Sequence, residues 1–268
     1  MQVASVSRRA LAGSMLILTL TACGGGGGSS VSPASPQSQG DVQAYCEAKR
    51  AFETAPSPAV DFQSASPEEV VEAGKSYAAT TLLPIFDNLV ATAPPEVLDA
   101  SKLLHSGMTR LQETGDFFLF NAPEYGAAQA ATHLFDRENC GWGRVNLTTT
   151  DYAFEGVPET LPAGTVSFDV TNRSDTEIHE MAILKKADGV TEPIQELLGP
   201  SAIAPPEKTT LVVDGLAQPG SSSYEVADLQ PGNYAMVCFV HVGATHQNPQ
   251  GDGPPHHAKG MVAEFTVN

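Results

Sequence analysis

The spacing of apolar residues changes near residue 145 and divides the chain into two patterns. In the first half, apolar side chains recur every three or four residues, as on one face of a helix. The clearest such face is made by Val97, Ala100, Leu104, Met108 and Leu111. In the second half, short apolar runs lie between turn residues, and Val166, Phe168 and Val170 alternate with other positions as in a half-buried strand. The patterns predict an all-α domain over residues 41–141 and an all-β domain over residues 145–268.

The first domain is expected to be a four-helix bundle with up-down-up-down topology, because short loops join its helical segments. The expected helices cover residues 41–55, 66–93, 94–115 and 116–139. Ser66 and Glu69 form a capping box at the start of the second helix. Pro84 is expected to bend or break that helix, because proline has no amide N–H. Gly115 ends the third helix, and the fourth should be irregular around residues 123–126.

The second domain is expected to be a Greek-key β-sandwich of about seven strands. The expected strands cover residues 145–152, 165–171, 179–185, 209–213, 220–226, 232–239 and 260–267. Pro, Gly and Asn residues separate these runs and mark the turns between them.

The last part of the chain carries potential ligands for a metal ion. Cys238 lies in an apolar run, His256 and Met261 follow after a loop, and His179 precedes an upstream apolar run. Two His, one Cys and a distant Met are the ligands of a trigonal copper site used for electron transfer. A lone Met or Cys in an apolar strand is more often a core residue. The combination predicts a site for one type 1 copper ion.

The order of these motifs resembles the cupredoxin family of blue copper proteins, which includes plastocyanin and azurin. A turn with Asn172 precedes the first histidine, residues 228–234 lead into the cysteine, and Pro-His-x-x-x-Gly-Met lies near the end of the chain. The resemblance covers only residues 145–268, and it implies a metal site at one end of the sandwich. The implied ligands are the imidazoles of His179 and His256, the thiolate of Cys238 and, axially, the thioether of Met261. His257 is an alternative to His256, because both spacings to the methionine occur among related proteins.

Two features depart from the small members of the family. Glu180 follows the first histidine, where an Asn is common, and this places the usual hydrogen bond at that position in doubt. The loop over residues 239–255 is long, and such loops are usually functional or disordered. In small members the second histidine reaches the surface at an apolar docking patch. The resemblance therefore implies electron transfer through an exposed edge of His256, with the loop forming or covering the patch. Alternatively, His241 and His246 of the loop form a metal-acquisition cluster with His257.

The N-terminus has the pattern of an export signal. Arg8 and Arg9 precede a short apolar run that is too short to span a bilayer, so residues 1–22 are expected to be a signal peptide. The ending Leu-Thr-Ala-Cys resembles the lipobox of bacterial lipoproteins, which implies lipid modification of Cys23; an ordinary cleavage that leaves this thiol free is the alternative. Residues 23–40 are rich in Gly, Ser and Pro and are expected to be a flexible tether. The two arginines suit either general or twin-arginine export.

With Cys23 assigned to lipid and Cys238 to metal, Cys46 and Cys140 remain. In an oxidising compartment a disulfide between them is the simplest expectation, and two buried free thiols are the alternative. The protein is therefore expected outside the cytoplasm, in the periplasm or on the outer face of the cytoplasmic membrane, held by a lipid anchor.

Composition limits the partners. The formal net charge is −17, so the surface repels nucleic acid and should attract a redox protein with a basic docking face. The predicted function is one-electron transfer between redox partners, with copper binding or delivery without electron shuttling as the alternative.

Catalysis is not expected: multicopper oxidases have histidines beside the cysteine, where this chain has Val237 and Phe239, and copper nitrite reductases need a second cupredoxin domain. His105 and His133 lack partners at ligand spacing and are expected to have surface or packing roles.

Overall fold

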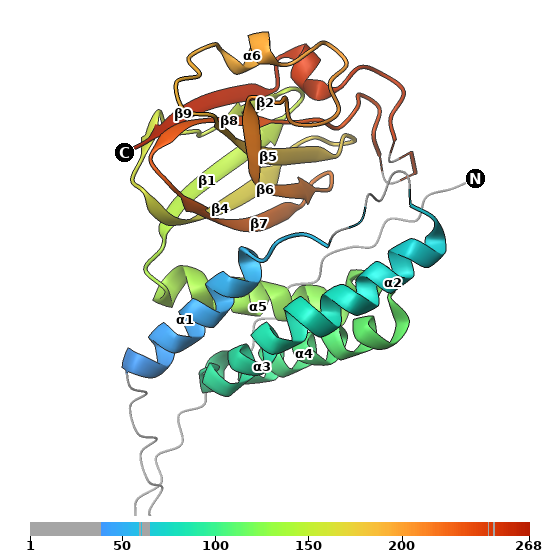
Figure 1. Ribbon diagram of the computed structural model, residues 1–268, viewed down its shortest axis with the longest axis vertical. Helices are drawn as coiled ribbons and strands as arrows, with labels where there is room; N and C mark the ends of the chain where they lie inside the picture. The colour runs from blue at the N-terminus through green and yellow to red at the C-terminus, as the bar shows by residue number, and fades with distance from the viewer. Residues whose placement is uncertain (1–38, 59, 61–64, 246, 249) are drawn as a thin grey trace, which may run out of the picture. The chain divides into compact units, whose positions relative to one another are not determined.

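The computed structural model describes residues 39–58, 60, 65–245, 247–248 and 250–268. The predicted signal peptide, Cys23 and the tether up to residue 38 lie outside these residues. The described elements belong to one compact unit, which is helical up to Cys140 and consists mainly of β-strands after it (Figure 1). A helical region followed by a two-sheet β-sandwich confirms the predicted fold class.

The helical region contains α1 (Gln39–Glu53), α2 (Pro67–Tyr77), α3 (Leu83–Thr92), α4 (Pro95–Thr114) and α5 (Pro123–Asn139). Helix α1 begins and ends two residues earlier than predicted. Helices α2 and α3 are the halves of the predicted second helix, and the π-helical turn η1 (Ala78–Leu82) joins them. Pro84 lies in the first turn of α3 and cannot donate to the preceding turn, which accounts for the irregularity on its N-terminal side.

Helix α4 ends at Gly115, whose φ of 70° is the left-handed conformation that glycine adopts readily. The 3₁₀ turn η2 (Phe117–Asn121) follows, and α5 begins at Pro123. The predicted irregularity therefore precedes Pro123. Its extension to Gly126 is wrong, because Gly126 lies inside α5. A glycine within a helix costs only about 1 kcal/mol, which packing against neighbouring helices can offset.

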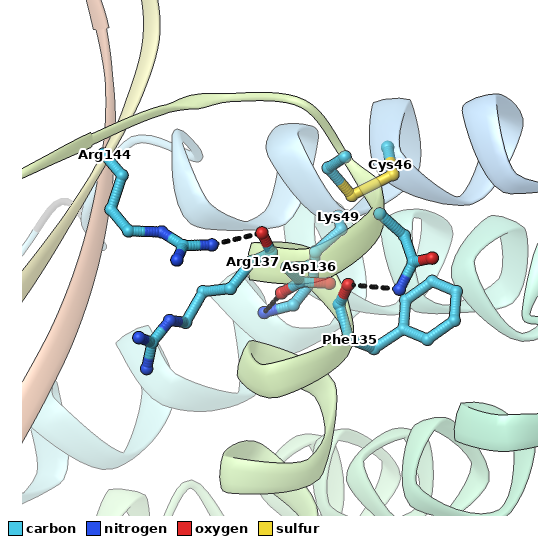
Figure 2. The surroundings of a disulfide bond; sticks show 8 residues. Cys46, Lys49, Phe135, Asp136, Arg137 and Arg144 are labelled. Carbon is cyan, nitrogen blue, oxygen red and sulfur yellow. Dashed lines mark hydrogen bonds and ion pairs between the residues drawn. A yellow bond between two sulfur atoms is a disulfide. The ribbon is translucent and has the colours of Figure 1, made fainter.

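A disulfide joins Cys46 of α1 to Cys140 at the end of α5, with the two Cα atoms 5.4 Å apart. The predicted pairing is confirmed. Next to it, Lys49 is 1% exposed, contacts the carboxylate of Glu53 and lies 3.5 Å from a carboxylate oxygen of Asp136 (Figure 2). One buried lysine thus interacts with two carboxylates in the core of the helical region.

The sandwich is made of two sheets, ordered β2-β1-β4-β7 and β3-β9-β8-β5-β6. Their strands are β1 (Gly143–Thr150), β2 (Ala153–Glu155), β3 (Thr160–Leu161), β4 (Gly164–Asn172), β5 (His179–Lys186), β6 (Thr209–Ala217), β7 (Ser222–Leu229), β8 (Gly232–Val237) and β9 (Val262–Val267). Strand β1 pairs with β4 in parallel, as β3 does with β9, and the remaining pairs are antiparallel. The seven predicted strands are present within a few residues. The short elements β2, β3 and α6 (Ile194–Leu197) were not predicted, because two to four residues carry no readable periodicity.

The core between the sheets is formed by alternate residues of the strands. Phe168, Ile183 and Met236 are fully buried in it, and Leu229 and Phe265 pack with them. Strands β5 and β8 are antiparallel neighbours, with Ala182 opposite Val237. The start of β5 and the end of β8 therefore lie at the same end of the sandwich.

Side chains of the helical region contact the sheet that contains β4 and β7. The ring of His133 stacks on Tyr224 at 4.2 Å between centroids. Arg137 lies 3.4 Å from Asp169. His133 therefore has the packing role expected for it. Within the described residues, no helix is both long and apolar enough to cross a bilayer.

Candidate metal centre

Two neighbouring strands and one turn bring the predicted ligands together. His179 is the first residue of β5, and Cys238 directly follows the last residue of β8. His256 begins the 3₁₀ turn η3 (His256–Lys259), and Met261 lies between that turn and β9. Gly260 separates them with a φ of 104°, a conformation that other residues rarely adopt. The turn can therefore close tightly enough to place His256 and Met261 at one end of the sandwich.

Backbone hydrogen bonds hold the turn against the cysteine. The amide of Met261 donates to the carbonyl of His256 at 3.2 Å, and the amide of Cys238 donates to the carbonyl of Met261 at 3.3 Å. The amide of His257 in turn donates to the carbonyl of Cys238 at 3.0 Å. Met261 is fully buried. The thioether is therefore carried by a residue whose backbone is bonded to two of the predicted ligands.

The side chains of His179, Cys238 and His256 form a buried group whose ligand atoms all lie within 4.8 Å of one another. The two Nδ1 atoms are 3.2 Å apart, and Nδ1 of His256 lies 3.3 Å from Sγ of Cys238. Among the described residues, this is the grouping of His, Cys and carboxylate side chains that is close enough to hold an ion. With the buried Met261 beside it, the cluster has the composition typical of a type 1 copper site.

The carboxylates behind the two imidazoles bear on whether this cluster suits a cation. Nε2 of His179 lies 3.0 Å from Oδ1 of Asp151, and Nε2 of His256 lies 3.4 Å from Oε2 of Glu177. The hydrogen bond between Nε2 of His179 and Asp151 favours the tautomer with its proton on Nε2, which leaves the Nδ1 lone pair of His179 free to bind an ion. The two Nδ1 atoms and the sulfur thus converge at separations of 3.2 and 3.3 Å, as ligand atoms around one ion do. The donor set therefore fits a soft or borderline metal ion.

Glu180 occupies the position where an Asn is common, and it makes two hydrogen bonds across the site. Its backbone amide donates to Sγ of Cys238 at 3.3 Å, and its carboxylate accepts from the amide of Phe239 at 3.0 Å. The hydrogen bonding that the sequence placed in doubt is therefore present in this form. These two hydrogen bonds connect the start of β5 to Cys238 and to the residue that follows it.

Burial changes the acid–base properties of the metal-free site. Burial raises the pKa of the Cys238 thiol to about 12, although the Glu180 amide opposes this. Burial, followed by the neighbouring ring of His179, lowers the pKa of His256 to about 4. Burial also lowers the pKa of His179, and the carboxylate of Asp151 opposes the shift. The histidines are thus ready to bind as neutral ligands, whereas metal binding must displace the thiol proton.

The exposed edge expected for His256 is absent. Its ring is 0% exposed, so the implied direct contact of this ring with a partner is wrong. Tyr152 packs over it with ring centroids 4.7 Å apart, and Glu177 covers Nε2. Both residues belong to segments outside the long loop, which explains why the sequence motif did not reveal the cover.

The other histidines near the site have different roles. His257 is buried, but its Nε2 bonds to the carbonyl of Ala202 at 2.7 Å, and it lies outside the metal-ligand grouping. His241 forms an isolated β-bridge with Pro255. His246 lies outside the described residues. The geometry therefore favours His256 over His257 as the ligand.

The long loop is held by backbone contacts. The amides of Asp252 and Gly253 donate to the carbonyl of Val242, and the amide of Gly243 donates to both carboxylate oxygens of Glu177 at 2.9 and 3.1 Å.

Asp151, Tyr152 and Glu177 were not identified from the sequence. An acidic or aromatic residue in a turn carries no signal of its own, and only the fold places these three behind the imidazoles.

Comparison with known proteins finds only weak similarity, and only among solved structures. No protein-family model and no curated protein sequence matches the chain. Reduced auracyanin from Roseiflexus castenholzii is similar at 22% identity over 47% of this chain and 96% of its own, with a TM-score of 0.33. Auracyanin A, a "blue" copper protein from Chloroflexus aurantiacus, matches at 19% identity over 48% and 100%, with a TM-score of 0.31. Rusticyanin from Thiobacillus ferrooxidans matches at 19% identity over 47% and 76%, with a TM-score of 0.32. The fold assignment rests on strand order, and the metal assignment on the geometry of the cluster.

Proposed function

We propose that this protein is a type 1 copper protein that carries single electrons between redox partners outside the cytoplasm. The observation that carries the proposal is the convergence of two Nδ1 atoms and one sulfur, 3.2 and 3.3 Å apart, in a buried cluster with Met261. When bound, copper supplies a reversible one-electron couple. All four expected ligands are buried, as suits outer-sphere electron transfer.

The protein's contribution is to hold the ligands in one arrangement in both oxidation states. His179 is oriented by Asp151, Cys238 accepts a hydrogen bond from Glu180, and His256 is fixed through its backbone. These ligands lie on or next to strands of one sheet, so their positions change little when the charge of the site changes. Little reorganisation favours rapid electron exchange.

The proposed location is the outer side of the cytoplasmic membrane or the periplasm. The lipobox-like segment before Cys23 supports a lipid anchor, and the disulfide supports an oxidising compartment. With a net charge of −17, the proposed partner is a redox protein with a basic docking face.

The test is the visible spectrum of the copper-loaded chain together with three variants. Wild type should show intense thiolate-to-copper charge transfer, and Cys238→Ser should abolish it. His256→Ala should lose or strongly change the band, whereas His257→Ala is the matched control because that neighbouring ring bonds to Ala202 instead. Circular dichroism checks that each variant is folded. A colourless wild type at full copper loading would exclude the type 1 assignment.

Voltammetry separates electron transfer from copper delivery. A carrier gives a reversible one-electron wave and keeps its copper after reduction, because its ligands are buried. Release of copper to a chelator on reduction would instead favour a delivery protein.

A further inference from the structure

The burial of His256 raises the question of how electrons reach the surface. Its ring is 0% exposed, and the ring of His179 is also buried. Neither imidazole can therefore touch a docked protein directly. A route by way of an imidazole therefore passes through a residue that contacts the imidazole on one side and solvent on the other.

The turn between β1 and β2 provides such residues. Asp151 bonds through Oδ1 to Nε2 of His179 at 3.0 Å, yet its side chain is 43% exposed. Tyr152, the next residue, packs its ring on His256 at 4.7 Å and is partly exposed. Two consecutive residues thus each contact one of the two buried imidazoles.

The other group behind an imidazole is less suitable as a surface contact. The side chain of Glu177 is only 12% exposed, and both of its oxygens accept from the amide of Gly243. Glu177 is therefore a buried link between His256 and the loop, and offers little surface to a partner. Asp151 is different, because a carboxylate with one bonded oxygen can still accept a hydrogen bond from a cationic side chain.

We propose that the Asp151–Tyr152 turn is the docking point and electron port for a redox protein with a basic face. The proposal rests on the proposed function and names the surface through which it operates. A lysine or arginine of the partner contacts Asp151, which places the partner's redox centre near Tyr152. One electron leaves the reduced site, the partner's oxidised centre gains it, and no bond or proton is exchanged. The negative charge of the whole chain favours the approach of such a partner.

The test uses two small oxidants of opposite charge on the copper-loaded, reduced chain. Tris(phenanthroline)cobalt(III) is the cationic probe, and hexacyanoferrate(III) is the anionic probe. Asp151→Asn keeps an oxygen that can bond to Nε2 of His179 but removes the charge. The matched control is Asp99→Asn, which removes an exposed carboxylate from helix α4. Any change in reduction potential acts on both probes, so the ratio of their rates isolates local charge.

The rate ratio of cationic to anionic probe should fall on the order of tenfold in Asp151→Asn at low ionic strength, and the effect should shrink with added salt. Asp99→Asn should leave the ratio near that of wild type. Equal ratios in both variants would overturn the docking role of Asp151. The charge-transfer band and the reversible wave of wild type and of Asp99→Asn, whose substituted side chain lies outside the site, keep this outcome distinct from failure of the proposed function.

The role of Tyr152 is tested by Tyr152→Ala beside Tyr152→Phe. If the ring conducts, the alanine variant slows exchange with both probes, whereas the phenylalanine variant retains the wild-type rate. An unchanged or faster rate in Tyr152→Ala would make the ring only a cover for His256 and would overturn the port. The spectrum of each variant confirms an intact site.

Discussion

Asp136 in the helical core is expected to make the stability of this protein depend on pH. Its side chain is fully buried in the core of the helical region. Lys49 is the nearby cation and lies 3.5 Å from a carboxylate oxygen of Asp136 (Figure 2). Its amine contacts the carboxylate of Glu53 more closely. Burial therefore dominates and raises the pKa of Asp136 from 3.8 to about 6, against the opposing effect of Lys49.

The sign and size of the effect follow from linkage. An acid whose pKa is higher in the folded state stabilises the fold below its unfolded pKa, and this stabilisation is lost as pH rises through the folded value. The shift from 3.8 to about 6 is roughly two pKa units, or about 3 kcal/mol at 1.36 kcal/mol per unit. The pKa of Glu53 is lowered instead, to about 2. The stability that Glu53 contributes is therefore lost only when the pH falls towards that value.

The perturbation is Asp136→Asn, which keeps the shape and removes the titration. Urea unfolding of the copper-free chain, followed by the helical circular dichroism signal, gives the free energy of unfolding at pH 4.5 and pH 8. The variant's free energy minus that of wild type should be larger at pH 8 by about 2–3 kcal/mol. Asp99→Asn removes an exposed carboxylate from α4 and is the control. Its free energy of unfolding should change with pH as that of wild type does. Parallel curves for Asp136→Asn as well would refute the assignment of a raised pKa to this buried carboxylate.

Two further predictions concern stability and the copper loop. Replacing Cys46 and Cys140 by serine opens a link across 94 residues, which costs about 4–5 kcal/mol in the chain-entropy model; thermal unfolding of the variant should no longer respond to reductant, as that of wild type does. Gly251→Ala places a Cβ 2.7 Å from two carbonyl oxygens of the loop and should weaken copper retention, measured by transfer to a chelator. Gly220→Ala has a similar φ of 66° but open space around it, so it separates the clash from backbone strain, and equal copper loss in both variants would count against the clash.

Elements with repeated patterns were predictable, and short ones were not. The apolar face of α4 extends over several turns, and its end at Gly115 follows from glycine's access to positive φ. The break before Pro84 follows from the missing amide. Strands β2 and β3 contain three and two residues, and they form only because β1 and β9 are available to pair with them. Local sequence cannot contain that information.

The metal ligands were predictable because their types, order and spacing are themselves the signal. Asp151, Tyr152 and Glu177 were not, because each acts through a residue far away in the chain. The same holds for the burial of His256, which was expected at the surface and is covered by Tyr152 instead. A side chain's exposure depends on what the rest of the fold places over it.

The sequence by itself determined the division into a helical region and a β-sandwich, the disulfide, and the set of residues able to hold copper. These depend on periodicity, on proline and glycine, on the number of cysteines and on ligand chemistry, all of which can be read from the residues without the fold. Only the tertiary structure decided which histidine faces the cysteine, which carboxylates lie behind the imidazoles, and where the site approaches solvent. Those features arise from pairing between strands and turns distant in the chain, and their positions are set by packing.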